Sequence, residues 1–417
     1  MRVFKFGGAS VRDAENVKNV CRVLQTVGYK DSLIVASAMG KTTNALEVVV
    51  HNYFQNRFDL AESVEVVKKY HFDIVNELFT DKEHQVFVRL KELFDSITYF
   101  LLNNKSPNYN FVYDQIVSYG EIISTTILHF YLQECGITNK WIDARNALKT
   151  DTVYRDANVN WDITVENIKR EINTDDLCIT QGFIGSDYNG FSTTLGREGS
   201  DYSAAIFAYA LEAQSVTIWK DVPGVLNADP RYFEDTTLLQ HISYQEAIEL
   251  AFYGASVIHP KTLQPLRQKE IPLYVKSFLN PTLAGTNVSK GAPLTPQVPC
   301  FIVKKNQLLI SLSSKDFSFI MEQNISDIFK LFCEYNIKVN VIQNSAISFS
   351  VCVEDKFNHF EDLRLRLVND YKVSYNENVS LYTVRHFDNN SAERILTGKT
   401  LLLKQVNRET MQIVTKE

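Results

Sequence analysis

The chain has 417 residues, 45% hydrophobic and 22% charged, which is enough apolar material for two or three packed domains and excludes a disordered chain. Lys and Arg total 43 against 49 for Asp and Glu, and the resulting charge of −6 argues against nucleic acid or an anionic membrane as partner. The cysteines form no C-x-x-C pair, the first residues do not resemble a signal peptide, and no apolar run reaches the ~20 residues of a spanning helix, so we expect reduced thiols and a cytoplasmic location.

Short apolar runs of β type alternate with longer helical stretches in the first part of the chain. Such alternation is typical of βαβ units, so we expect an α/β fold with a mainly parallel sheet and helices on both faces. Residues 60–104 carry apolar side chains at spacings of three and four without Gly or Pro, which predicts a helical insertion. The predicted strands are 2–6, 32–37, 140–143, 177–184, 215–219 and 272–277, and the predicted helices are 16–27, 46–54 and 114–133.

A segment rich in Gly and Pro follows these elements. Residues 287–300 contain Gly291, Pro293, Pro296 and Pro299, which indicates a linker between a first domain at 1–286 and a second at 301–417. The second domain shows the order βαββαβ, which is typical of the ferredoxin-like fold. Its predicted strands are 308–313, 338–343, 347–353 and 379–384, and its predicted helices are 325–335 and 360–368. Apolar runs at 401–403 and 411–414 would add strands to the same sheet or to a partner's sheet.

The first candidate site is Lys5-Phe6-Gly7-Gly8-Ala9-Ser10, between the first predicted strand and a helix. Adjacent glycines let the backbone approach a phosphate, their N–H groups can form an anion nest, and the helix N-terminus adds a favourable dipole. Lys5 would supply a mobile positive charge. A plain strand-to-helix turn accounts for the two glycines about equally well.

The segment Ser37-Ala38-Met39-Gly40-Lys41-Thr42-Thr43-Asn44 also joins a predicted strand to a helix. It imitates the end of a Walker A loop, but Val35 stands where that loop requires glycine, so the segment is not a P-loop. Its hydroxyls and amides could hold a substrate carboxylate, and an ordinary N-cap turn is the alternative. Further on, Glu121 lies in an apolar helix, where its burial requires a cation: a substrate ammonium or a structural Arg or Lys.

The densest motif combines residues 180–185 with residues 193–205, which read Thr-Thr-Leu-Gly-Arg-Glu-Gly-Ser-Asp-Tyr-Ser-Ala-Ala. Hydroxyls, glycines and a small-residue helix suit an anion site at a helix start. Arg197 offers the planar fork that carboxylates prefer, while Asp201 either acts in the site or only caps the helix. Residues 219–231 then predict a strand end, a Pro-Gly turn and an exposed loop, where nucleotides are commonly bound in parallel sheets.

Together with Gly254-Ala255-Ser256-Val257-Ile258-His259-Pro260, these blocks resemble the aspartate kinase family of the amino-acid kinase superfamily over residues 1 to about 285. The C-terminal βαββαβ unit resembles the ACT domain of that family. The resemblance implies an enzyme that uses ATP and Mg²⁺ to phosphorylate the β-carboxylate of L-aspartate, giving 4-phospho-L-aspartate. This reaction is the first step of the aspartate-family pathway to lysine, threonine, methionine and diaminopimelate.

The resemblance also implies residue roles. Lys5 would contact the transferring phosphoryl group, and Asp201 would orient Lys5 and organise the metal-phosphate cluster. No metal site built from protein ligands alone is expected. Aspartate would be held by Thr43, Glu121, Arg197 and Ser200, with Glu121 on the α-ammonium and Arg197 on a carboxylate. The nucleotide would contact Lys5, Gly7, Gly8, Ser10, Lys220, Asp221, Leu226, Arg231, Ser256 and Val257.

Several residues depart from the family pattern. Leu226 replaces a usual aromatic residue and Ser256 a usual Lys, whose charge Lys220 would restore. In the second domain, residues 313–325 lack the glycine of effector-binding loops, and Asn340 stands where lysine-responsive members carry Asp. The resemblance implies lysine or threonine as effector, and we expect a single ACT fold with an extension, paired as a homodimer.

Two other functions remain as alternatives. One is a kinase for another acidic amino acid such as glutamate, although residues 195–202 favour aspartate. The other is a non-catalytic amino-acid sensor on a kinase scaffold, against which the joint presence of Lys5, Glu121, Arg197 and Asp201 argues.

Overall fold

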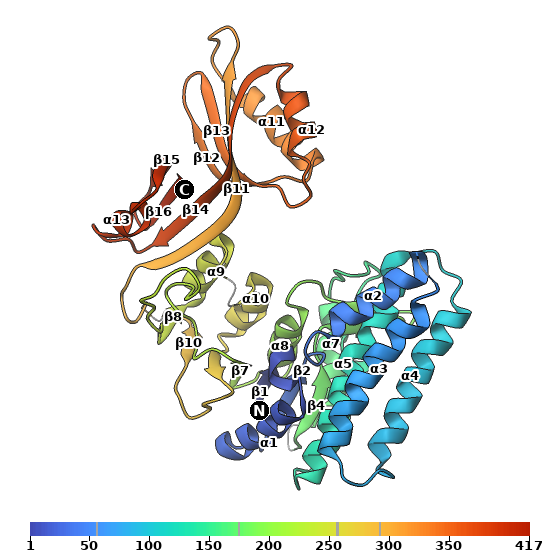
Figure 1. The fold of residues 1–417 in the computed structure, drawn as a ribbon. Helices are drawn as coiled ribbons and strands as arrows, with labels where there is room; N and C mark the ends of the chain where they lie inside the picture. The colour runs from blue at the N-terminus through green and yellow to red at the C-terminus, as the bar shows by residue number, and fades with distance from the viewer. Residues whose placement is uncertain (56, 174–175, 256–257, 292) are drawn as a thin grey trace. The chain divides into compact units, whose positions relative to one another are not determined.

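The computed structural model describes residues 1–55, 57–173, 176–255, 258–291 and 293–417. The chain forms two compact units, and Figure 1 follows it from the N-terminus in blue to the C-terminus in red. The first unit contains Met1–Val225, Leu238–Ala251 and the described part of 256–296. The second contains Leu226–Thr237, Phe252–Ala255 and Gln297–Glu417, so it includes two short segments from within the predicted first domain.

The first unit is built on a sheet of eight strands in the order β3-β4-β2-β1-β7-β9-β10-β8, whose neighbours are parallel except for β9 and β10. The central strands are buried on both faces, which explains the adjacent apolar residues at 3–4 and 33–36. The mainly parallel α/β fold is confirmed. The strands are β1 (Arg2–Phe6), β2 (Ser32–Ala36), β3 (Lys140–Ile142), β4 (Cys178–Gln181), β7 (Ser215–Lys220), β8 (His241–Ser243), β9 (Leu273–Ser277) and β10 (Thr286–Ser289).

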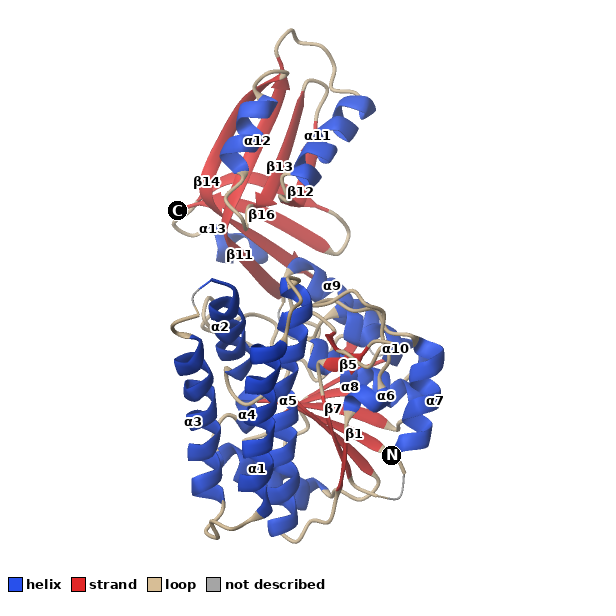
Figure 2. Ribbon diagram, turned by 90° about the vertical axis from the view of Figure 1, so that its right-hand side faces the viewer, coloured by secondary structure: helices blue, strands red, loops and turns tan. Residues whose placement is uncertain are grey.

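Two sets of helices cover the sheet, one on each side in Figure 2. α5 packs on β2, β3 and β4, whereas α8 packs on β1, β2 and β7. The first set is α1 (Ala14–Val27), α2 (Thr42–Gln55), α3 (Leu60–Leu78), α4 (Gln85–Asn103) and α5 (Tyr109–Glu134). The second is α6 (Ala144–Ala147), α7 (Trp161–Glu171), α8 (Gly199–Ala210) and α10 (Pro260–Lys269). The unit also has η1 (Gly8–Val11), most of α9 (Tyr244–Tyr253), whose last two residues belong to the second unit, and the hairpin of β5 (Ile184–Ser186) and β6 (Ser192–Thr194).

The predicted helical insertion is confirmed as α3 and α4. Both helices bury one stripe and expose the other, as their apolar spacing predicts. α3 packs against α1, α2 and α4, and α4 packs against α5, so the insertion covers the other helices of the first set. Among the described residues, no helix combines the length and apolar character that a membrane span requires.

The second unit is an antiparallel sheet of six strands in the order β12-β13-β11-β14-β16-β15. Its first four strands and two helices follow the predicted βαββαβ order, and β15 and β16 extend the same sheet. The elements are β11 (Cys300–Ser314), α11 (Glu322–Glu334), β12 (Lys338–Asn344), β13 (Ser348–Glu354), α12 (Phe360–Leu367), β14 (Tyr371–Arg385), α13 (Ser391–Leu396), β15 (Thr400–Val406) and β16 (Thr410–Lys416).

Several boundaries differ from the prediction. The predicted strand 177–184 ends at Gln181 as β4, and Ile184 begins β5, which belongs to the separate two-stranded sheet. The predicted strands 308–313 and 379–384 are parts of β11 and β14, which have 15 residues each, because a register shift near residue 307 lets the strands pair along their length. The first half of β14 alternates Tyr371, Val373 and Tyr375 with polar residues, which is the period of a strand, so its sequence carried a signal that the prediction missed. The predicted linker 287–300 also begins inside β10, where buried Thr286 and Val288 alternate with half-buried neighbours.

Candidate active site

A cavity of about 370 Å³ lies at the carboxyl ends of the central strands of the first unit. Lys5 is the second-last residue of β1, Ala38 follows β2, and Lys220 ends β7, so neighbouring strands deliver their side chains to one edge of the sheet. The start of α8 and the middle of α5 close the cavity from the two faces. Its lining residues are Lys5, Gly8, Ser37, Ala38, Gly40, Thr43, Glu121, Phe183, Gly196, Glu198, Gly199, Ser200, Asp201 and Lys220.

A nearly buried ion pair joins Lys5 and Asp201 across the cavity wall. Lys5 Nζ lies 2.5 Å from Asp201 Oδ1, and Lys220 Nζ lies 4.0 Å from Asp201 Oδ2. Burial alone would raise the pKa of Asp201, but the charges of Lys5 and Lys220 outweigh it, and the pKa of Asp201 is lowered. Asp201 is therefore ionised at neutral pH and fixes the ammonium of Lys5 at the cavity.

Glu121 brings a second carboxyl group to the cavity from α5. Its side chain is 2% exposed; Oε1 accepts a hydrogen bond from the Ala38 N–H at 3.2 Å, and Oε2 has no hydrogen-bond partner among the described residues. Burial raises the pKa of Glu121 to about 8, against smaller opposing effects of the Ala38 N–H and of Lys5. A buried oxygen without a partner at a cavity wall is suited to a cationic ligand.

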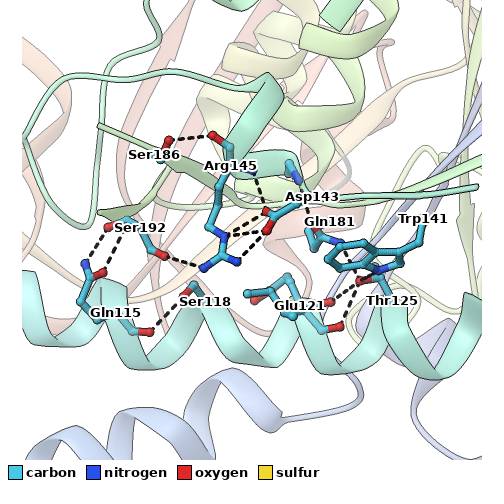
Figure 3. Close-up of polar contacts among 12 residues, drawn as sticks. Gln115, Ser118, Glu121, Thr125, Trp141, Asp143, Arg145, Gln181, Ser186 and Ser192 are labelled. Atoms are coloured by element: carbon cyan, nitrogen blue, oxygen red, sulfur yellow. Dashed lines mark hydrogen bonds and ion pairs between the residues drawn. The ribbon is translucent and has the colours of Figure 1, made fainter. Parts of the chain in front are cut away.

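Hydrogen bonds on both sides of Glu121 hold α5 in place, as Figure 3 shows. Before Glu121, Gln115 donates to the Ser192 carbonyl at 2.8 Å and accepts from the Ser192 N–H at 3.1 Å. After Glu121, the Thr125 hydroxyl oxygen accepts from Gln181 at 2.8 Å and from the Trp141 indole at 3.1 Å. These contacts join α5 to β6, β4 and β3 and position Glu121 at the cavity wall.

The start of α8 rests against the loop after β4. A Cβ on Gly182 would lie 2.7 Å from Ser200 Cβ and 2.9 Å from its Cα, so the approach requires glycine. Ser200 and Asp201 therefore depend on Gly182 for their position.

We predict that Gly182→Ala displaces the start of α8, lowers kcat/KM at least tenfold and costs about 1–3 kcal/mol of stability through overpacking. Steady-state kinetics and thermal unfolding measure the two effects. Gly190→Ala is the control, because Gly190 has φ +83° but no atom within 4 Å of the added Cβ. This control should lower stability only, and an equal loss of activity in both variants would contradict the prediction.

The structure brings together most of the predicted site residues of the first unit. Lys5, Gly8, Thr43, Glu121, Ser200, Asp201 and Lys220 line the cavity, and a Cβ on Gly7 would lie 3.5 Å from Lys5 Nζ. Ser10 is buried, and its hydroxyl donates to the Trp219 carbonyl at 3.2 Å, so it joins the loop to β7.

Other predicted residues do not line the cavity. Arg197 and Asp221 have exposed side chains in the first unit. Leu226 and Arg231 belong to the second unit, where the Arg231 guanidinium forms a bidentate pair with Asp229. The predicted nucleotide residues Ser256 and Val257 lie outside the described residues.

Seven lining residues were assigned no individual role from the sequence: Ser37, Ala38, Gly40, Phe183, Gly196, Glu198 and Gly199. Glu198 adopts a left-handed conformation, with φ +54°, as the N-cap of α8, and its buried Oε2 has no hydrogen-bond partner among the described residues. Glu198 precedes Asp201 by three residues, which is about one helical turn, and this spacing is the only sequence signal that could have pointed to Glu198.

Comparison with known proteins places this arrangement in a family. Residues 1–277 match the model of the Amino acid kinase family. Aspartokinase 1, chloroplastic, of Arabidopsis thaliana is 33% identical over 368 residues, covering 84% of this chain, and this chain spans 63% of that protein's length. Lysine-sensitive aspartokinase 3 of Escherichia coli (strain K12) is 31% identical over 357 residues, covering 84% of this chain and 78% of that protein.

Solved structures give the same result. Escherichia coli aspartokinase III in complex with lysine and aspartate (T-state) has a TM-score of 0.83 and 26% identity, covering 99% of this chain and 95% of that chain. The same enzyme in complex with aspartate and ADP (R-state) has a TM-score of 0.81 and 26% identity, covering 100% and 96%. The chain therefore belongs to the amino acid kinase family and, within it, to the aspartokinases.

Proposed function

We propose that this protein is an aspartate kinase, which transfers the γ-phosphoryl group of ATP to the β-carboxylate of L-aspartate and forms 4-phospho-L-aspartate and ADP. The observation that carries the proposal is that one cavity holds both the Lys5–Asp201 ion pair and Glu121 Oε2, which has no hydrogen-bond partner in the part of the chain that the structure describes. The ion pair suits a phosphoryl group, and the Glu121 carboxyl suits the α-ammonium of an amino acid. The R-state relative is described with aspartate and ADP, the same two ligand classes.

The aspartate would lie between Glu121, Thr43 and Ser200. Glu121 would take the α-ammonium, and the two hydroxyls would donate to carboxylate oxygens. Arg197 is exposed, so it would reach a substrate carboxylate only after its side chain turns toward the cavity. Arg197 would then add a charge-assisted contact in the bound state.

The chemistry needs no general base. The β-carboxylate of aspartate has a pKa near ~3.9 and is already ionised at neutral pH. One of its oxygens forms the new bond to the γ-phosphorus as the bond to the ADP oxygen breaks. Both partners are anions, so Lys5 and the loop amides at Gly7 and Gly8 would lower the barrier by neutralising charge in the transition state.

Asp201 is the residue that would hold Mg²⁺. Mg²⁺ is usually bound by one or two carboxylates together with substrate phosphates, and Asp201 is an ionised carboxylate at the cavity. Among the described residues, no group of three His, Cys, Asp or Glu side chains could hold a metal ion. When bound, Mg²⁺ would neutralise phosphate charge.

The remaining roles follow the same proposal. The nucleotide would contact Gly7, Gly8, Ser10, Lys220 and Asp221, together with Leu226, Arg231, Ser256 and Val257. Residues 1–286 would form the catalytic domain, 287–300 the linker and 301–417 an ACT-type domain with a C-terminal extension. This second domain would mediate a homodimer and bind lysine or threonine as effector; the T-state relative is described with lysine.

An acyl-phosphate assay with hydroxylamine trapping tests the function. Purified protein with ATP and Mg²⁺ should give signal with L-aspartate and not with L-glutamate. Signal with glutamate alone would favour a kinase for another acidic amino acid, and no signal with either would favour the non-catalytic sensor. Addition of lysine or threonine then tests the effector, and light scattering tests the dimer.

A further inference from the structure

Two loops at the cavity contact each other directly. The phosphate loop is defined as residues 7–12 after β1, and the substrate loop as residues 37–43 after β2. The Gly40 N–H donates to the Gly8 carbonyl at 3.0 Å, and a Cβ on Gly8 would lie 2.9 Å from the Ala38 carbonyl oxygen. Only glycine permits this approach, so the conformation of each loop depends on the other.

Helix α3 of the insertion reaches both loops through Tyr70. The Tyr70 hydroxyl donates to the Arg12 carbonyl at the end of the phosphate loop. It also lies beside the substrate loop, because a Cβ on Gly40 would be 2.7 Å from the same hydroxyl. Partial burial, with a further effect of Asp13, raises the pKa of Tyr70, so the hydroxyl keeps its proton and remains a donor.

The next residue, His71, holds the substrate loop from within the protein. Its ring is fully buried, with Nδ1 2.7 Å from the Val67 carbonyl and Nε2 3.3 Å from Thr42 Oγ1. A carbonyl can only accept, so Nδ1 carries the proton; the Thr42 hydroxyl donates to the Met39 carbonyl at 2.6 Å, and Nε2 lies against the same Oγ1 as a second, longer acceptor. Burial lowers the pKa of His71 to about 4, and the ring is neutral at physiological pH. Thr42 directly precedes Thr43, which lines the cavity.

We propose that Tyr70 and His71 are positioning residues, through which α3 fixes the phosphate and substrate loops relative to each other and sets the affinity for the acceptor amino acid. Neither side chain lines the cavity, so both act through loop residues. Tyr70 acts on both loops through Arg12 and Gly40, whereas His71 acts on the substrate loop alone through Thr42. The inference rests on the proposed function and gives the helical insertion a role in substrate binding.

The difference between the two contacts makes the proposal testable. Tyr70→Phe removes only a hydroxyl and should raise KM for both aspartate and ATP about three- to tenfold, the effect of one lost hydrogen bond, with kcat within about twofold. His71→Gln should raise KM for aspartate by a similar factor and leave KM for ATP unchanged. Aspartate binding measured by calorimetry without turnover should weaken in parallel.

Tyr99→Phe is the matched control, because Tyr99 lies on α4 of the same insertion with its side chain 70% exposed. It should leave both KM values unchanged. A lower Tm with unchanged KM values in Tyr70→Phe would overturn the proposal, since the hydroxyl would then contribute only to stability. If His71→Gln does not fold, Tyr70→Phe alone decides. Absence of aspartate phosphorylation by the wild-type protein would instead refute the proposed function.

Discussion

Replacing Lys5 with methionine is expected to lower kcat about 100- to 1,000-fold, the usual effect of removing one preorganised charge from a transition state. The same change should destabilise the protein at neutral pH by about 3–5 kcal/mol, because it leaves the Asp201 carboxylate buried next to an apolar side chain. Lys220, 4.0 Å from Asp201, compensates only in part. Initial rates and denaturant unfolding measure the two losses.

The pH dependence of the stability that Lys5→Met loses follows from the pKa of Asp201. In the wild type its pKa is lowered in the folded state, so the pair stabilises the protein above the unfolded pKa near ~3.9 and this stability is lost as pH falls. In Lys5→Met, burial is no longer opposed by Lys5 and the pKa of Asp201 rises. The stability difference between the two proteins should therefore shrink as pH falls from 7 toward 4.

A double variant separates the two losses. Lys5→Met with Asp201→Asn removes both charges, so it should recover most of the stability that Lys5→Met loses while remaining inactive. Lys18→Met, which breaks an exposed pair with Glu15, is the charge-matched control and should change neither property. Recovery of activity in the double variant would show that Lys5 serves only to neutralise Asp201.

Local periodicity explains why much of the fold was predictable. β1 and β2 are buried on both faces, and their adjacent apolar residues, with Gly7 and Gly8 directly after β1, could be read from the sequence. The same signal places Lys5 and residues 37–43 at strand ends, which is why the cavity could be anticipated. The short strand β10 carries no such signal, because only Val288 among its four residues is apolar and the strand is stabilised by pairing with β9 and β8.

The parts of the site that were not predictable depend on contacts between distant segments. Tyr70 and His71 look like ordinary members of an amphipathic helix, and their partners Arg12 and Thr42 lie 58 and 29 residues away. The close contact of Gly182 with Ser200 also depends on the tertiary structure, because a glycine after a strand does not by itself indicate which segment packs against it. Arg197 was predicted from its motif, but its side chain is exposed, because a motif identifies a residue type and not the direction of its side chain.

The titration of Glu121 should couple aspartate binding to proton release. With a pKa of about 8 in the free protein, Glu121 is mostly protonated at pH 7, yet a substrate ammonium requires the carboxylate. Binding should therefore release close to one proton at pH 7, and aspartate affinity should increase about fivefold between pH 7 and pH 8 and level off above pH 8. Calorimetry in two buffers of different ionisation enthalpy measures the released proton.

Glu121→Gln should abolish this coupling and weaken aspartate binding about 10- to 100-fold, since a charge-assisted contact is lost, while KM for ATP changes little. The amide can still accept from the Ala38 N–H, so the local packing should remain intact. Unchanged aspartate affinity in this variant would remove Glu121 from the substrate site.

The same substitution should increase stability, which distinguishes a binding residue from a structural one. The raised pKa of Glu121 means that the folded protein prefers the protonated form, so this stabilising contribution is complete below pH ~4.5 and is lost as pH rises to about 8. Glu121→Gln mimics the neutral form at every pH. Its Tm should therefore exceed that of the wild type at pH 8 and match it near pH 4.5. A lower Tm for Glu121→Gln at pH 8 would instead show that the carboxylate stabilises the fold, with its charge already compensated inside the protein.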